Sequence, residues 1–253
     1  MSEHVEMIPV EGLPEIGSGD RLGELIAAAV AAGGALADGD VVVVSQKVVS
    51  KAEGRLVDLA DVEPGDSAVE LAGRLGKDPR IVELILRESA EVVRAEREVL
   101  IVEGSGGWIS ANAGIDASNV PGRERVTLLP ADGDESARRL RAELREACGA
   151  APGVVVADSF GRPWRLGQVD VAIGCAGLMP LDDWRGRRDR QGDELTATVV
   201  GVADELAAAA DLVRGKDEGI PAAIVRGLGR FVTREDGPGA GALRRPKEED
   251  LFR

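Results

Sequence analysis

The sequence contains no tyrosine, one histidine and few aromatic residues of any kind. Aromatic residues make up 2% of the 253 residues, so the core has to be built from the aliphatic side chains of a chain that is 44% apolar. That apolar content suffices for one large domain or two small ones. The single histidine, His4, lies near the amino terminus, where chains are usually frayed, which argues against a histidine base in catalysis.

Cysteine and long apolar runs are also scarce. Cys148 and Cys175 lack the spacing of metal ligands, which predicts reduced thiols in a cytoplasmic protein. The amino terminus has no basic stretch followed by an apolar run, so no signal peptide is expected. The longest apolar stretch, LIAAAVAAGGALA, is short and interrupted by glycines, which indicates a helix of a soluble protein and no membrane span.

Positive charge is in deficit. The chain has 31 lysines and arginines against 45 acidic residues, a formal net charge of -14. Such a surface repels nucleic acid phosphates and anionic membranes, so neither is expected as a partner. An anionic small-molecule substrate would need local lysines, arginines, metal ions or helix N-termini to neutralise it.

What the sequence does contain is an alternation of helix and strand patterns, which predicts a mixed α and β fold. Asp20 is expected to cap a helix over residues 22–32, and Asp78-Pro79 to open another with RIVELILRES. Further helices are expected over residues 134–147 and in VVGVADELAAAADLV. The runs DVVVVSQ and GVVVADS predict strands buried on both faces, and EVLIVEG, RVTLLP, QVDVAIGCAG and PAAIVRGLG predict others.

Two stretches outside this alternation are strongly polar. Residues 236–253 form a carboxyl-terminal arm rich in glycine, proline and charge, after a main unit over residues 1–235 that has room for two subdomains. The run DDWRGRRDRQGDE indicates a solvated loop, and its functional alternative is a mobile basic flap over an anion.

Two acidic loops, each preceded by an apolar run, raise the question of a metal site. ANAGIDASN contains Asp116 and Asn119, and VADSFGRPWRLGQVD contains Asp158 and Ser159. A single aspartate in a loop is usually a turn former. Hard oxygen ligands of this kind also suit Mg²⁺ or Mn²⁺, which bind few side chains and share phosphate oxygens.

Three further segments have the composition of a phosphate site. In VVVVSQKVVSKAEGR a buried strand ends at Ser45-Gln46 and is followed by Lys51 and Arg55; the alternative is a solvated, lysine-rich strand exit. The glycines of GLPEIGSGD allow backbone amides to approach a ligand, or mark a plain loop before the first helix. RGKDEGIPAAIVRG is either a third part of the site or a helix end with a charged loop. No P-loop motif occurs.

Together these blocks resemble the coenzyme F420-0:L-glutamate ligase family, whose members attach γ-linked glutamates to a deazaflavin coenzyme. The resemblance rests on LPEIGSGD, GDVVVVSQKVVSKAEGR, ANAGIDASNV, VADSFGRPWRLGQVDVAIGCAGL and GIPAAIVRGLG, which occur in family order from residue 12 to about residue 230. It implies an α+β fold with mixed sheets that is not a Rossmann fold, and an intertwined homodimer. It also implies a cytoplasmic ligase that acts on small molecules.

The resemblance further implies GTP as co-substrate, two divalent cations, Mg²⁺ or Mn²⁺, and K⁺. Asp116 and Asp158 would act in catalysis and bind one cation, and Ser159 would help to bind the second. The residues implied for the nucleotide are Leu13, Pro14, Glu15, Ile16, Ser45, Gln46, Lys51, Asn119, Gly215, Lys216, Asp217, Glu218, Gly219, Ile220, Pro221 and Ala222.

The chain departs from the family pattern at Lys216. By the resemblance, archaeal members of the family have a glutamine there that contributes to the second metal, whereas a protonated lysine cannot ligate a cation. Either Glu218 substitutes as ligand, or Lys216 acts directly on phosphate.

The implied chemistry suits the residues, because phosphoryl transfer asks for positioning and charge neutralisation and not for a covalent nucleophile. GTP would activate the terminal carboxylate of F420-0, and then that of F420-1, as an acyl phosphate that the glutamate amine attacks. Two alternatives use the same loops: a metal-dependent phosphotransferase or phosphatase, and a GTP-binding regulator without turnover.

Overall fold

A computed structural model describes residues 4–116 and 124–252 of the chain. Its largest sheet has five strands in the order β1-β12-β2-β8-β9. The strands are β1 (Glu6–Pro9), β12 (Ala222–Arg226), β2 (Val41–Ser45), β8 (Gly153–Arg162) and β9 (Arg165–Ala176). β2 and β8 run parallel, and the other neighbours run antiparallel. The mixed sheet agrees with the expected α+β class and differs from the all-parallel order of a Rossmann fold.

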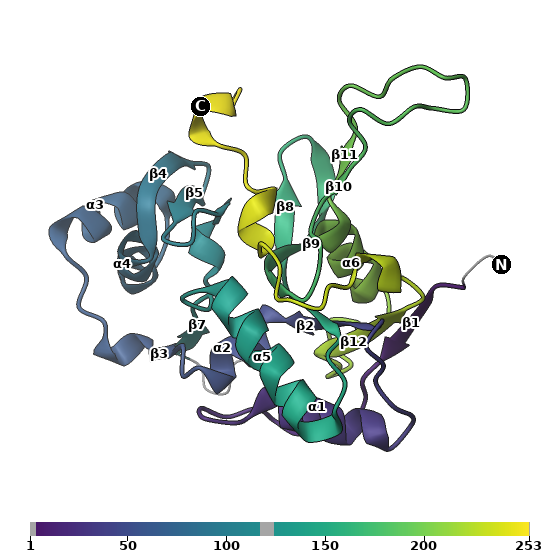
Figure 1. The fold of residues 1–253 in the computed structure, drawn as a ribbon. Coiled ribbons are helices and arrows are strands. Elements are labelled where there is room, and N and C mark those ends of the chain that lie inside the picture. The colour runs from purple at the N-terminus through teal and green to yellow at the C-terminus, as the bar shows by residue number, and fades with distance from the viewer. Residues whose placement is uncertain (1–3, 117–123, 253) are drawn as a thin grey trace.

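Helices cover both faces of this sheet (Figure 1). α1 (Leu22–Ala31) and α5 (Gly133–Cys148) pack on one face, and α6 (Val202–Asp211) packs on the other. Val42 and Val44 belong to the first layer of the core, whereas Val41 and Val43 belong to the second. All four valines are fully buried, and each contributes about 1.5–3 kcal/mol. The prediction of a strand buried on both faces is confirmed.

A smaller group of elements lies beside the main sheet (Figure 1). α3 (Asp66–Leu75) and α4 (Pro79–Arg87) pack against the sheet of β4 (Ser89–Glu96), β5 (Val99–Gly104) and β6 (Ile109–Ala111). The two-stranded sheet of β3 (Leu56–Asp58) and β7 (Arg125–Thr127) lies between this group and α2 (Gln46–Ala52). α2 and α3 were not predicted from the sequence. The lysine-rich segment that follows β2 is helical and forms α2.

Two predicted helix starts have different outcomes. Asp78 caps α4, since its carboxylate accepts a hydrogen bond from the backbone N–H of Arg80 at 2.8 Å. The prediction that Asp20 caps α1 is wrong. The residue before α1 is Arg21, and the Asp20 carboxylate accepts a hydrogen bond from the N–H of Gly17 at 2.7 Å. Asp20 therefore closes the preceding loop and does not cap the helix.

The polar segments pack differently from each other. Residues 183–194, which follow β10 (Asp182–Asp183) and lead towards β11 (Val199–Val200), are exposed, as expected of a solvated loop, and extend from the molecule (Figure 1). In the arm, by contrast, Ala240 is fully buried, and its N–H donates to Asp134 at 2.6 Å. In the part of the chain that the structure describes, no helix is long and apolar enough to cross a membrane.

Candidate active site

The parallel strands β2 and β8 end at the same edge of the main sheet, and the candidate site lies there. Ser45 is paired with Ala157, so Gln46 and Asp158 follow side by side. The N–H of Ser45 donates to the carbonyl of Pro221 at 2.8 Å, which brings the segment before β12 to the same edge. Three blocks that lie far apart in the sequence thus meet where buried parallel strands emerge, the usual place for a ligand in such sheets.

Gln46 begins α2 and presents an unused hydrogen-bond donor. Its side chain is buried, and its Oε1 atom accepts a hydrogen bond from the hydroxyl of Ser50 at 2.9 Å. Its Nε2 atom makes no hydrogen bond within the described residues, although the amide lies near enough to Asp158 to favour that residue's charged form. A buried donor without a partner is costly, and a ligand oxygen would satisfy it.

Lys51, one turn and a half further along α2, is a buried cation. Its Nζ atom lies 2.5 Å from a carboxylate oxygen of Glu15, which belongs to the loop before α1. The Lys51 side chain is 8% exposed and that of Glu15 is 70% exposed. The ammonium therefore lies under a movable acid, which an incoming anion of higher charge can displace.

Asp116 is held by a strained turn. Asn112, Ala113 and Gly114 all have positive φ values, of 54°, 54° and 68°. For residues with a Cβ atom this costs on the order of 1–3 kcal/mol each. A Cβ atom at Gly114 would lie 2.7 Å from the Leu129 side chain, so the turn fits only glycine there. The turn is followed by Asp116, whose backbone exchanges two hydrogen bonds with Thr127.

Asp158 is the most perturbed acid of the site. Burial is the main cause that raises its pKa to about 7, and the negative charges of Asp170 and Asp116 add to it. The backbone N–H of Ser159 and the nearby amide of Gln46 oppose the shift of this pKa. A cation between Asp116 and Asp158 would offset both the burial and the repulsion, so this pair fits a divalent ion.

Lys47 lies next to this pair and was not singled out from the sequence. Its Nζ atom lies 2.8 Å from a carboxylate oxygen of Asp116. Among the described residues, no group of three or more His, Cys, Asp and Glu side chains is arranged to hold a metal. A cation here would consequently take two carboxylates and complete its shell with phosphate oxygens and water, as Mg²⁺ usually does.

Ser159 belongs to a second polar cluster, on the side of α6. Its hydroxyl donates to Asp170 Oδ1 at 2.6 Å and accepts from Lys216 Nζ at 2.7 Å. Arg214 is buried and binds the other carboxylate oxygen of Asp170. Lys216 also lies 3.2 Å from Asp211 and 3.6 Å from Asp170.

The remaining predicted residues differ in position. Glu218 is exposed and folds against Gly215, whose added Cβ atom would lie 2.9 Å from its carboxyl carbon. Within the described residues no hydrogen bond or ion pair joins Glu218 to either cluster, and its role as a ligand of a second cation stays a prediction. Asn119 lies outside the described residues.

Of the residues that sequence reasoning missed, Asp170 carried a signal. It is an acid within the apolar run VDVAIG, and buried charge in a strand is unusual enough to demand a partner. Its cationic partners Arg214 and Lys216 lie just after α6, and no local pattern links them to β9.

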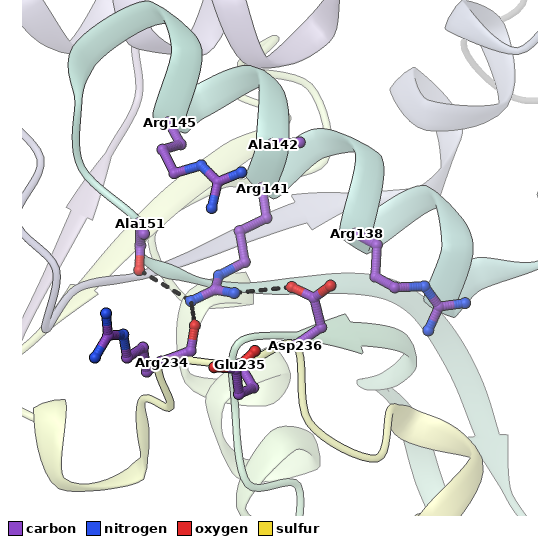
Figure 2. A pocket seen from close by; sticks show the side chains of 8 residues that line it. All are labelled: Arg138, Arg141, Ala142, Arg145, Ala151, Arg234, Glu235 and Asp236. Atoms are coloured by element: carbon purple, nitrogen blue, oxygen red, sulfur yellow. Dashed lines mark hydrogen bonds and ion pairs between the residues drawn. The ribbon is translucent and has the colours of Figure 1, made fainter.

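A cavity of about 140 Å³ lies elsewhere, between α5 and residues 234–236, and is rich in arginine (Figure 2). Arg141 crosses it, donating to the carbonyl of Thr233 at 2.8 Å and to Asp236 at 2.8 Å. Ala151, which lines it, precedes β8, and Asp158 lies about 16 Å further along that strand. Arg141 thus anchors the carboxyl-terminal segment here, at a distance from Asp158.

A larger cavity, of about 290 Å³, lies close to the site. Its lining includes Trp108, Ser110, Ala113, Ile173 and Arg244. Ile173 is two residues from the cross-strand neighbour of Asp158 on β9, a separation of about 7 Å. Ala113 belongs to the turn that leads to Asp116.

Comparisons with known proteins find relatives over nearly the whole length of the chain. The family model described as F420-0:Gamma-glutamyl ligase matches residues 12–227. The chain is 47% identical to the Coenzyme F420:L-glutamate ligase of Methanothermobacter thermautotrophicus, over 98% of this chain and 99% of that protein. It is 47% identical to the protein of the same name from Methanopyrus kandleri and 41% identical to that from Methanocaldococcus jannaschii, each over 98% of this chain and 97% of the relative.

Proposed function

Because the chain belongs to the F420-0:gamma-glutamyl ligase family, we propose that it forms an amide bond between the amine of L-glutamate and the terminal carboxylate of coenzyme F420-0, with GTP as the energy source. The observation that carries the GTP-dependent part is the meeting of Gln46, Asp116 and Asp158 at the shared end of β2 and β8, from which α2 leads to the buried cation Lys51. The unused donor and the acid pair lie at the strand ends, and the cation lies further along the helix that begins there.

The proposed reaction has two steps. A carboxylate oxygen of the acceptor attacks the γ-phosphorus of GTP, the bond to the β-phosphate oxygen breaks, and GDP leaves. The amine of glutamate then attacks the acyl carbon, phosphate leaves, and the amine loses a proton to give the amide. A divalent cation held by Asp116 and Asp158 supplies charge neutralisation for the phosphates when it is bound. The Gln46 amide donates to a phosphate oxygen, and Lys51 exchanges Glu15 for the nucleotide.

We place the acceptor in the cavity lined by Trp108 and Arg244. Trp108 offers an aromatic surface for a planar ring, and Arg244 a cation for an acidic group. Its lining residue Ala113 lies three residues before Asp116, and Ile173 lies two residues from the cross-strand neighbour of Asp158, so an acceptor bound there can extend towards the two acids.

The test is a reaction of the purified chain with F420-0, GTP, Mn²⁺ and glutamate, followed by mass spectrometry and phosphate release. We expect a γ-glutamyl product, GDP and phosphate in equal amounts, and none of them without glutamate and acceptor together. Phosphate release in the absence of glutamate, without amide product, would instead indicate a phosphatase. GTP binding without any product would indicate a regulator.

A further inference from the structure

The cluster around Ser159 already contains a cation of the protein itself. The Lys216 ammonium lies 2.7 Å from the Ser159 hydroxyl oxygen. A hydroxyl has one donor and two acceptor positions. The donor of Ser159 is directed to Asp170, and one acceptor position is taken by Lys216.

We infer that the Lys216 ammonium takes the place of a second divalent cation at Ser159, so that the active site binds one divalent cation and supplies the other positive charge itself. This inference rests on the proposed function, since it concerns the same phosphate site. The inference departs from the expectation of two bound cations. It also assigns the compensation for the missing glutamine to Lys216 and not to Glu218.

Geometry makes the two cations exclude each other. Mg²⁺ binds oxygen ligands at about 2.0–2.1 Å, so an ion on the Ser159 hydroxyl would lie within a few ångströms of the ammonium. Two positive charges about 4 Å apart repel strongly even near a protein surface. The ion would have to displace Lys216 from Ser159, Asp170 and Asp211 at once.

The charge of the cluster leads to the same conclusion. Asp170 and Asp211 carry two negative charges, and Arg214 and Lys216 carry two positive charges within 4 Å of them. The cluster is therefore neutral without a metal. The neighbouring group of Asp116, Asp158 and Lys47 has two acids and one cation, and it keeps a negative charge when both acids are ionised. As far as the described residues compose these two groups, the one with Asp116 and Asp158 is the more negative and is the better place for a divalent ion.

Lys216 is also placed to meet a phosphate. Its side chain is 69% exposed, and it follows Gly215, whose φ of 57° turns the chain at the end of α6. The ammonium thus lies at the solvent-facing side of Ser159, which is the residue next to Asp158 in the chain. A phosphoryl group bound between the two clusters would be contacted by a divalent ion on the Asp158 side and by the ammonium on the Ser159 side.

The test is the number of Mn²⁺ ions bound per chain, measured by equilibrium dialysis and electron paramagnetic resonance with a non-hydrolysable GTP analogue. We expect one ion for the natural chain and for Lys216→Arg, which keeps the charge. Lys216→Gln should bind two ions and show the line broadening of a coupled Mn²⁺ pair. Lys247→Gln is the matched control, because Lys247 is a similarly exposed lysine, 2.6 Å from Glu91.

Each outcome decides the matter. Two ions in the natural chain, or one ion in both it and Lys216→Gln, would overturn the inference. Circular dichroism and affinity for the analogue show whether Lys216→Gln is folded; if it is not, Lys216→Met replaces it, with two ions again expected. Failure of the natural chain to bind Mn²⁺ together with the analogue would count against the proposed function, a result distinct from either stoichiometry.

Discussion

The ammonium of Lys47 lies 2.8 Å from a carboxylate oxygen of Asp116. The pair joins the start of α2 to the turn that follows β6, across the edge where the candidate site is built. It means that Asp116 is neutralised by a lysine in the metal-free protein, and that a divalent ion has to compete with this lysine.

Lys47→Met should therefore strengthen Mn²⁺ binding in the absence of nucleotide. Both side chains are partly exposed, at 23% and 36%, so solvent screens the pair and the gain should be about 1 kcal/mol, or roughly fivefold in affinity. Isothermal titration calorimetry measures it, with Lys77→Met as the control. An unchanged or weaker affinity for Mn²⁺ would show that Lys47 does not compete with the ion.

Asp158→Asn should abolish most of the turnover. The substitution removes a charge from the acid pair proposed to hold the cation, and loss of one strong electrostatic stabiliser costs at least roughly 100-fold. Steady-state kinetics at saturating Mn²⁺ measures the effect, and circular dichroism verifies the fold. Near-normal turnover would remove Asp158 from the catalytic machinery.

The same residue predicts a pH dependence of stability in the metal-free protein. The pKa of Asp158 is raised to about 7 in the folded chain, against about 3.9 for an unfolded aspartate, so the folded state holds the proton more tightly between these values. The free energy of unfolding of the natural chain should accordingly fall as the pH rises from 5 to 8.

Asp158→Asn lacks this ionisation. Its stability relative to the natural chain should increase by about 2 kcal/mol between pH 5 and pH 8. Urea unfolding in EDTA at the two pH values measures the difference. A difference that does not change with pH would mean that the Asp158 carboxyl keeps its ordinary pKa.

Lys51→Met should weaken GTP binding about tenfold or more and leave acceptor binding much less affected. Methionine keeps the buried stem of the side chain and removes only the charge, which is proposed to meet a phosphate. Glu15→Gln is the companion variant: it removes the competing acid and should not weaken GTP binding. Unchanged affinity for GTP in Lys51→Met, by calorimetry, would make Lys51 a structural partner of Glu15 alone.

Arg141→Met should destabilise the fold by about 3 kcal/mol without affecting the chemistry. Arg141 is buried and joins α5 to Asp236 and to the carbonyls around it (Figure 2), and its removal leaves the carbonyl oxygens of Pro152 and Thr233 without their donor and the half-exposed Asp236 carboxylate without its partner. Arg145→Met, one turn further along the same helix, should change stability by less than about 0.5 kcal/mol. Denaturant unfolding compares them, and equal stability of the two variants would contradict the anchoring role.

Sequence periodicity was enough for the elements with strong local patterns. The valine run of β2 predicts burial on both faces wherever it packs, and Asp78-Pro79 specifies a helix start from neighbouring atoms alone. Asp20 failed as a cap because N–H groups of the preceding loop and of the helix start compete for its one carboxylate, and only the closed loop decides which of them donates to it.

The candidate site divides in the same way. The sequence by itself determined the family, and it predicted Asp116, Asp158 and Lys51 as site residues, since these lie in contiguous blocks of recognisable residues. Only the tertiary structure decided that Lys47 meets Asp116, that Asp170 meets Arg214, and that Lys216 lies on Ser159. Such pairs are set by the parallel register of β2 and β8 and by the packing of α6 on the sheet. Contacts between residues far apart in the chain leave no periodic signal in the sequence.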